Sequence, residues 1–390
     1  MLSNLKEESL KLHENGGKWE INSKVPLETK DDLSRAYTPG VAEVCKKVEN
    51  NFEEAKKYTM IKNTVAVITD GSAVLGLGNI GTFGALPVME GKAILFKKFG
   101  NIDAIPICIK TQDAKEIIEI IKQISDTFGG INLEDISAPR CFEIEEELKK
   151  SLKIPIFHDD QHGTAIVVLA GLINALKLTG RKKEDAKIVI AGAGAAGIAI
   201  SKLLLEYGFK KITLCDSKGI ISKNRKDLNW IKLEMSKVTN LENKEGGLKE
   251  ALAGADIFIG VSGPNTVSEE MARSMNKRAI IFAMANPVPE IMPERAKSAG
   301  VEIIGTGRSD YPNQINNVLA FPGVFRGVFD ANYSKITNSS KIAAANAISE
   351  LVNENELKVE YIIPSPFDPR VAKTVAEAVK KQCEIEKNSN

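Results

Sequence analysis

The stretch Ile188-Val-Ile-Ala-Gly-Ala-Gly-Ala-Ala-Gly197 decides the fold of the second half of this chain. An apolar run typical of a buried strand leads directly into a Gly-x-Gly-x-x-Gly pattern, and a helix-forming run follows. The next expected strand ends in Asp216, about 20 residues further on, where a carboxylate can bind a ribose hydroxyl. Because such glycines let a pyrophosphate approach a helix N-terminus, the stretch predicts a dinucleotide-binding βαβ unit. Its expected cofactor contacts are Gly192, Ala193, Gly194, Ala195, Ala196, Gly197 and Asp216.

Another Gly-x-Gly-x-x-Gly match occurs earlier, at Gly76-Leu-Gly-Asn-Ile-Gly81. It runs into Thr82-Phe-Gly-Ala-Leu-Pro87, where we expect no immediate helix, and no acid ends a following strand at the distance that a ribose contact requires. We interpret it as a tight backbone turn beside the active site. For the cofactor, Asp216 favours NAD because a carboxylate repels a 2′-phosphate, while Ser217 and Lys218 leave NADP as the alternative.

The alternation of expected strands and helices predicts an α/β protein of two domains. With 390 residues, the chain exceeds the roughly 250–300 residues at which a single core stops growing. We predict an N-terminal α/β substrate and metal domain over 1–160, which begins with a helical N-terminal segment near 5–13. We predict a C-terminal Rossmann-like domain with terminal helices over 161–390. Its parallel strands are expected at 187–191, 211–215, 256–261, 279–283 and 302–305.

Composition excludes several classes of function. Lys and Arg number 52 and Asp and Glu 51, so no bulk charge attracts nucleic acid or an anionic membrane. The longest apolar stretches, at 164–176 and 188–200, fall short of the ~20 residues that cross a bilayer and are rich in Gly and Ala. The N-terminus lacks the apolar core of a signal peptide, and the five cysteines show no CxxC pattern. We therefore predict a cytoplasmic protein with a small-molecule substrate, without nucleic-acid or membrane partners.

Acidic residues follow two neighbouring strands expected in the first domain. Glu134 and Asp135 come after one strand and Asp160 after the next, and the carboxyl ends of parallel strands share one edge of a sheet. Three such carboxylates would form a hard oxygen site suited to Mg²⁺ or Mn²⁺. For each acid alone, the alternative is a helix cap or a solvated turn. His158 and His162 allow a zinc site as a further alternative, which a carboxylate-rich set disfavours.

Seven blocks spread over most of the chain form a far more specific pattern than any single motif. They are Arg35-Ala-Tyr-Thr-Pro-Gly-Val-Ala42, Thr69-Asp-Gly-Ser-Ala-Val-Leu-Gly-Leu-Gly-Asn-Ile-Gly81, Met89-Glu-Gly-Lys-Ala93, Leu133-Glu-Asp-Ile136, Phe157-His-Asp-Asp-Gln-His-Gly-Thr164, Phe282-Ala-Met-Ala-Asn-Pro287 and Asn316-Asn-Val-Leu-Ala-Phe-Pro-Gly323. In this order they resemble the malic enzyme family in its short bacterial or archaeal form. The resemblance implies divalent-metal-dependent oxidative decarboxylation of malate to pyruvate with NAD(P).

The resemblance also implies a role for individual residues. Lys92 becomes the general base, Tyr37 the general acid, and Asn286 and Asn317 contact the dicarboxylate or the nicotinamide. It assigns Glu134, Asp135 and Asp160 as the metal ligands. A base for the C2 hydroxyl needs a near-neutral pKa, which a nearby divalent cation can give a lysine. Without the family, Lys92 would be a solvated surface lysine and Tyr37 a half-buried turn aromatic.

One departure concerns how malate is held. Ser72 and Ala73 stand where long-form relatives carry an acid and a substrate-binding arginine. Arg140 and the two asparagines are the candidates to replace that arginine. The resemblance further implies a homodimer or a higher oligomer, in which the Tyr37 segment can come from the neighbouring subunit.

Two other classes of function stay open at this point. One is an NAD-linked dehydrogenase of another hydroxy or amino acid that does not decarboxylate its product. The other is a catalytically silent regulator that binds a dinucleotide. The three acids Glu134, Asp135 and Asp160 argue against the first, since plain hydride transfer needs no metal. The presence of Lys92 and Tyr37 argues against the second.

Overall fold

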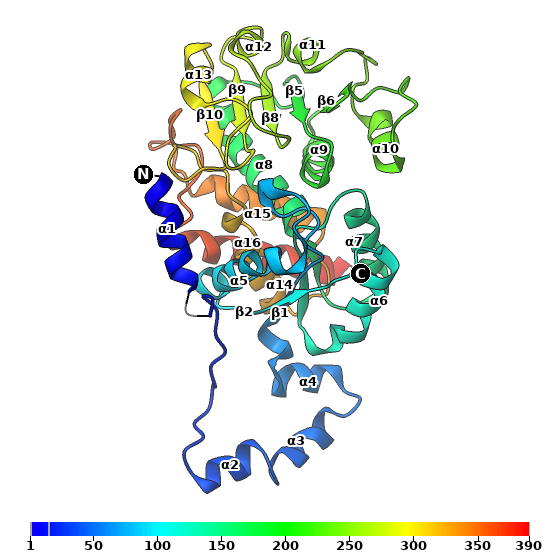
Figure 1. Cartoon of the computed structure of the whole chain (residues 1–390), viewed down its shortest axis with the longest axis vertical. Helices are drawn as coiled ribbons and strands as arrows, with labels where there is room; N and C mark the ends of the chain where they lie inside the picture. The colour runs from blue at the N-terminus through cyan, green and yellow to red at the C-terminus, as the bar shows by residue number, and fades with distance from the viewer. Residues whose placement is uncertain (1, 15, 390) are drawn as a thin grey trace.

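Two mostly parallel β-sheets organise the computed structural model, which describes residues 2–14 and 16–389. The first sheet contains β1 (Thr64–Thr69), β2 (Asp103–Cys108), β3 (Gly130–Leu133) and β4 (Ile156–His158) in the order β2-β1-β3-β4. The second contains β5 (Lys187–Ala191), β6 (Lys211–Asp216), β7 (Gly219–Ile220), β8 (Ile257–Gly260), β9 (Ile280–Ala283) and β10 (Ile303–Thr306) in the order β10-β9-β8-β5-β6-β7. The two sheets lie in different halves of the molecule (Figure 1). The predicted α/β class is confirmed.

Helices surround both sheets. Before and around the first sheet lie α1 (Leu2–His13), α2 (Lys30–Ala36), α3 (Val41–Val48), α4 (Phe52–Tyr58), α5 (Gly81–Gly100), α6 (Ala114–Ile124) and α7 (Arg140–Ser151). With the second sheet come α8 (Asp159–Thr179), α9 (Ala195–Tyr207), α10 (Trp230–Val238), α11 (Leu248–Leu252), α12 (Glu269–Arg273) and α13 (Pro293–Ser298). The chain ends with α14 (Phe321–Asp330), α15 (Asn338–Glu350) and α16 (Arg370–Ser389). Short 3₁₀ turns occupy Met60–Asn63, Leu75–Leu77, Ser125–Thr127 and Asn317–Leu319, the last labelled η4.

The second sheet contains all five predicted parallel strands and one strand that the sequence did not reveal. β7 pairs antiparallel with β6, with Asp216 opposite Gly219. Gly219 has a φ of +111°, which L side chains rarely adopt, so a glycine makes this tight reversal possible. A strand of two residues is too short to produce a hydrophobic pattern.

The helix α5 corrects our expectation for the first glycine-rich match. We expected no helix directly after Gly81, yet α5 begins there and contains Pro87. Ala85, Met89 and Phe96 recur on one face of this helix and are fully buried. Burial of that face outweighs the roughly 3 kcal/mol that an interior proline costs.

The central helix α8 is a core element. By length and composition, it is the one helix among the described residues that could cross a membrane. However, 72% of its most apolar window is buried inside the structure, where it packs against α9 and α15. Its first two residues, Asp159 and Asp160, are acids, so the helix starts before the apolar stretch that begins at residue 164.

Aromatic packing fixes α14 against the first sheet. The ring of Phe96 on α5 lies 4.6 Å from Phe321 and 5.3 Å from Phe325 on α14, centroid to centroid. Phe325 also lies 5.8 Å from Phe157 on β4, and all four rings are fully buried. The end of the chain thus returns to the first sheet, and the division of the domains at residue 160 stays a prediction.

The segment before β1 extends away from the body. None of its described residues between 5 and 60 is buried, and α2 and α3 project beyond the first sheet (Figure 1). We call residues 20–58 the arm. It exposes large apolar side chains, among them Ile21 at 79% and Leu27 at 61% exposure. Large exposed apolar patches are typical of surfaces that bind another molecule.

The aromatic cluster gives a stability prediction. Phe96→Ala should lower the free energy of unfolding by about 3–5 kcal/mol, because it opens a cavity between α5 and α14. Phe83→Ala, on the same helix but 94% exposed, should change it by less than about 0.5 kcal/mol. Urea denaturation followed by circular dichroism measures both, and equal effects would contradict this packing.

Candidate active site

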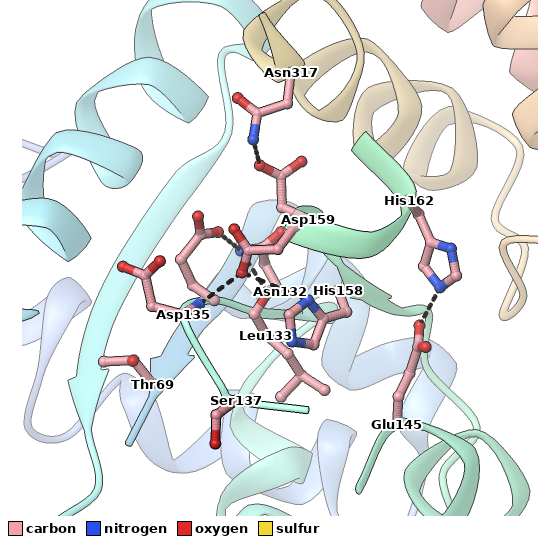
Figure 2. Close-up of polar contacts among 12 residues, drawn as sticks. Thr69, Asn132, Leu133, Asp135, Ser137, Glu145, His158, Asp159, His162 and Asn317 are labelled. Atoms are coloured by element: carbon pink, nitrogen blue, oxygen red, sulfur yellow. Dashed lines mark hydrogen bonds and ion pairs between the residues drawn. The ribbon is translucent and has the colours of Figure 1, made fainter. Parts of the chain in front are cut away.

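The site begins at the carboxyl edge of the first sheet, where β3 and β4 end side by side. Leu133 pairs with His158, so the acids that follow the two strands meet. The backbone N–H of Asp135 donates to Asp160 at 2.8 Å, and Figure 2 shows Asp135 and Asp159 at this edge. The prediction that both acidic pairs share one edge is confirmed.

Three carboxylates there could hold a cation. One oxygen each from Glu134, Asp135 and Asp160 lies within 4.8 Å of the others. Glu134 and Asp135 are buried, while Asp160 remains partly exposed. Burial raises the pKa of Glu134 well above its usual range, and the neighbouring carboxylates add to this while Lys92 opposes it. A divalent cation with oxygen ligands would relieve that repulsion, so these residues fit Mg²⁺ or Mn²⁺.

Lys92 enters this cluster from α5. Its Nζ lies 2.6 Å from Asp159 Oδ2 and 2.9 Å from Glu134 Oε1, and 4.5 Å from the ring centre of Phe321. Burial alone would lower the pKa of Lys92, but the two carboxylates outweigh it and hold that pKa above its usual value. Because the side chain is only 8% exposed, the alternative of a solvated surface lysine is wrong.

Two further side chains orient the cluster: Asp159, whose place in the sequence suggested that it positions Lys92 or a water, and Asn132, which the sequence did not single out. Asp159 accepts a hydrogen bond from Lys92. It also accepts one from the side-chain amide of Asn317 on η4 (Figure 2). Asn132 on β3, fully buried, donates to Glu134 at 2.8 Å. Asp159 had one signal, its place next to Asp160, whereas a strand asparagine has none.

Asn286 follows β9 and lies close to the loop after β1 and to the end of β10. Its carbonyl packs against Gly76, where a Cβ would collide with it, and its amide lies against Gly307. The first glycine-rich turn therefore comes close to the backbone of Asn286, as expected of a tight turn. Asn286 is exposed and, unlike Asn317, makes no hydrogen bond with the carboxylate cluster among the described residues.

Arg140 also reaches this edge. Its Nε and Nη2 each lie 3.0 Å from Asp70 Oδ2, and Asp70 is buried. The loop after Asp70 is connected to the three-carboxylate cluster, because Ala73 N–H donates to the carbonyl of Asp135 at 2.9 Å. Arg140 thus presents a guanidinium close to the carboxylate group, as its candidacy requires.

The dinucleotide loop has the backbone that its sequence predicts. Gly192 has a φ of +112°, and a Cβ there would lie 2.7 Å from the carbonyl carbon of Val261. Helix α9 begins at Ala195 directly after the loop, so its free N–H groups face the space above the strand ends.

Asp216 ends β6 with partners that the sequence did not single out. Arg225 donates to both of its oxygens, at 2.7 and 3.2 Å, and Lys232 Nζ lies 2.7 Å from Oδ2. Burial opposes ionisation, but these hydrogen bonds outweigh it and lower the pKa of Asp216. Neither cation stands near Asp216 in sequence, which is why the pattern missed them.

Tyr37 is not brought to the site within one chain. It ends α2 on the arm and is 67% exposed. Helices α2 and α3 of the arm lie well away from α5, the helix that carries Lys92 (Figure 1).

The histidines do not form a zinc site with the carboxylates. His162 turns away from the acidic cluster and bonds Glu145 at 2.7 Å (Figure 2). His158 is buried, with Nδ1 at 3.7 Å from Asp160 Oδ2, beyond direct hydrogen bonding.

Comparison with known proteins identifies this arrangement. The Malic enzyme, N-terminal domain family matches residues 16–149, and the Malic enzyme, NAD binding domain family matches residues 161–384. The chain belongs to the malic enzyme family. It is 57% identical to the bifunctional malic/malolactic enzyme of Bacillus subtilis, over 97% of this chain and 92% of that protein. It is 55% identical to the NAD-dependent malic enzyme of Geobacillus stearothermophilus, over 93% of this chain and 76% of that one.

A solved malic enzyme has the same fold. The crystal structure of malic enzyme from Pyrococcus horikoshii superposes with a TM-score of 0.93 at 48% identity, covering 98% of this chain and 91% of that chain. The predicted two-part α/β design and the family resemblance are confirmed.

The carboxylate group gives a metal prediction. Asp160→Asn should weaken Mn²⁺ binding by more than about 100-fold, since loss of an outer partner alone costs 10- to 100-fold. Titration of Mn²⁺ followed by the electron paramagnetic resonance signal of the free ion measures this. Asp126→Asn, at an exposed acid, is the matched control and should bind like the wild type. Equal affinity in all three proteins would remove Asp160 from the site.

Proposed function

We propose that this member of the malic enzyme family catalyses the oxidative decarboxylation of L-malate to pyruvate and CO₂ with reduction of NAD(P)⁺. The observation that carries the proposal is the contact of Lys92 with Asp159 and with Glu134, which belongs to the three-carboxylate cluster. A plain dehydrogenase needs a base and a cofactor, but it does not need the carboxylates.

In this proposal Lys92 acts as the general base. Its Nζ would accept the proton of the malate C2 hydroxyl, while Asp159 fixes the direction of the amine and Asn317 fixes Asp159. When bound by Glu134, Asp135 and Asp160, Mg²⁺ or Mn²⁺ would polarise the C2 oxygen and disfavour the charged form of Lys92. When bound along the glycine loop, the oxidised dinucleotide would accept the hydride from C2.

Substrate binding falls to Arg140 and the asparagines. Arg140 can offer N–H donors to a malate carboxylate while Asp70 keeps its guanidinium in place. Asn286 and Asn317 would provide amide donors on the side of the dinucleotide. Ala73 lacks a charged side chain, so a nearby guanidinium has to take over the role of the long-form arginine.

We propose a homodimer in which Tyr37 of one subunit acts as the general acid in the other. Three observations support it: the arm carries no buried residue among those described, it exposes apolar side chains, and it lies far from Lys92 of its own chain. From the partner, Tyr37 could protonate C3 after loss of CO₂.

We propose NAD as the preferred dinucleotide, with NADP as the weaker one. Asp216 is ionised at the end of β6 and would repel a 2′-phosphate. Arg225 and Lys232 screen this charge, which supports some use of NADP. We also propose a cytoplasmic location, supported by five free cysteines and the absence of a disulfide among them.

The activity has a direct assay. Incubation with L-malate, Mn²⁺ and NAD⁺ should give reduced cofactor, measured by absorbance, in equal amount to pyruvate. Lys92→Ala should lower kcat by roughly 10²- to 10⁴-fold, the usual contribution of a positioned base, with Mn²⁺ binding retained. Lys98→Ala, at an exposed lysine on the same helix, should keep the wild-type kcat. Reduced cofactor without pyruvate would favour the plain dehydrogenase.

Sharing of Tyr37 between subunits predicts complementation. Tyr37→Phe and Lys92→Ala homodimers should each be almost inactive. After mixing and subunit exchange, activity should return to about one quarter of wild type, because half of the dimers are mixed and each has one intact site. The same mixture should stay inactive if Tyr37 serves its own chain.

Cofactor choice predicts the effect of Asp216→Ser. The ratio of kcat/KM for NADP⁺ to that for NAD⁺ should rise by roughly 10- to 100-fold, since Arg225 and Lys232 become free to bind the 2′-phosphate. Asp227→Ser removes another partner of Arg225 but leaves the ribose contact, so it should shift the ratio far less. Equal shifts in both variants would mean that Asp216 does not set the preference.

A further inference from the structure

A cavity of about 180 Å³, with both polar and apolar side chains in its wall, lies at the junction of α7, α8, α9 and α15, apart from the acidic cluster. His162 lies in its wall and points toward Glu145 of α7, away from Asp159 (Figure 2). The cavity therefore lies on the far side of the start of α8. Because α7 flanks the first sheet and α9 follows the first strand of the second, the cavity borders both halves of the molecule (Figure 1).

Two buried side chains in the wall of the cavity have hydrogen-bond donors that are not fully used within the chain. Lys341 of α15 is only 5% exposed, and among the described residues its ammonium donates one long hydrogen bond, of 3.3 Å to Asn338 Oδ1. Gln161 is 3% exposed, and its Nε2 has no hydrogen-bond partner among the described residues. A buried donor without a partner costs about 1–3 kcal/mol, so this arrangement calls for an acceptor from outside the chain.

The carboxylates of the cavity are already engaged or lie at its rim. Glu145 Oε1 contacts both His162 and Lys149, each at 2.7 Å. Glu146 is exposed. Lys202 of α9 pairs with Glu234 at 3.1 Å, but both side chains are exposed and such pairs contribute little. Lys341, Lys202 and Gln161 thus stay available to a ligand.

Charge in the cavity favours an anion. Burial, helped by Lys149 and opposed by Glu145, lowers the pKa of Lys341 to about 7. His162 of α8 and Lys202 of α9 are the other charged or titratable groups at the cavity, with the exposed Glu146. An anion beside Lys341 would favour its charged form, so binding would take up a proton near neutral pH.

We propose that this cavity binds a free oxyanion of the size of phosphate, held by Lys341, Lys202 and Gln161, and that the anion links the start of α8 to α9 and α15 at the junction of the two halves. The site is distinct from the loop that would hold the dinucleotide phosphates, since Gly192 and Gly194 are not among its lining residues. It needs neither Lys92 nor the three carboxylates.

Calorimetric titration of sulfate into the full chain tests the proposal. Sulfate keeps its charge across the pH range used, and NAD⁺ is added first to occupy the dinucleotide loop. We expect saturable binding of one sulfate per chain, lost in Lys341→Met and weakened at least about tenfold in Lys202→Met. Lys335→Met removes an exposed lysine just before α15 and should bind like the wild type.

Proton uptake gives an independent measure. Sulfate affinity should fall by roughly 10- to 30-fold between pH 6 and pH 8.5 as Lys341 loses its proton, because only the charged fraction binds. In Lys202→Met the same pH dependence should persist around a weaker affinity.

Three results would overturn the proposal. They are no saturable sulfate binding by the wild type, wild-type affinity in Lys202→Met, and wild-type affinity in Lys341→Met. If Lys341→Met fails to fold, Lys202→Met decides alone, since its side chain is exposed and its loss leaves the core intact.

Discussion

Everything at the active site depends on the burial of a single ammonium group among carboxylates. Lys92 lies between Asp159 and Glu134, and Asp135 and Asp160 follow within the same edge of the first sheet. Four carboxylates against one lysine leave an excess of negative charge in a largely buried place, which is costly unless a cation compensates it. The same excess that disfavours the cluster by itself is what a divalent ion would neutralise. Relief of the repulsion between these carboxylates would therefore contribute to the affinity for a metal ion.

The rest of the fold holds that cluster in place. The register of β3 against β4 brings Glu134 and Asp135 close to Asp159 and Asp160. Helix α5 carries Lys92. The ring of Phe321 on α14 lies against the Lys92 ammonium, and the aromatic cluster behind it fixes α14 on the first sheet. η4, directly before α14, places Asn317 on Asp159. A segment near residue 320 therefore completes a site built mainly by the first 160 residues.

The sequence predicted those parts of the molecule that local pattern controls. The strand-loop-helix unit at Gly192 to Gly197 and the acids after β3 and β4 follow from apolar runs and strand ends, and the structure has them. Long-range pairing escaped prediction, because no local signal shows that Arg225 and Lys232 fold onto Asp216. Our expectation for the start of α5 was wrong for a related reason. Pro87 usually disfavours a helix, and the buried face that stabilises α5 depends on long-range packing. Domain limits and the roles of single residues stay predictions.

The most direct test of this account is the position of the metal. Crystals grown with Mn²⁺ and oxalate, a stable mimic of the reacting end of malate, can be measured at the manganese absorption edge. The account predicts one anomalous peak per chain among the carboxylates of Glu134, Asp135 and Asp160, with Lys92 Nζ within hydrogen-bond reach of the oxalate. A peak at His158 or at a surface acid, with the three carboxylates bare, would contradict it.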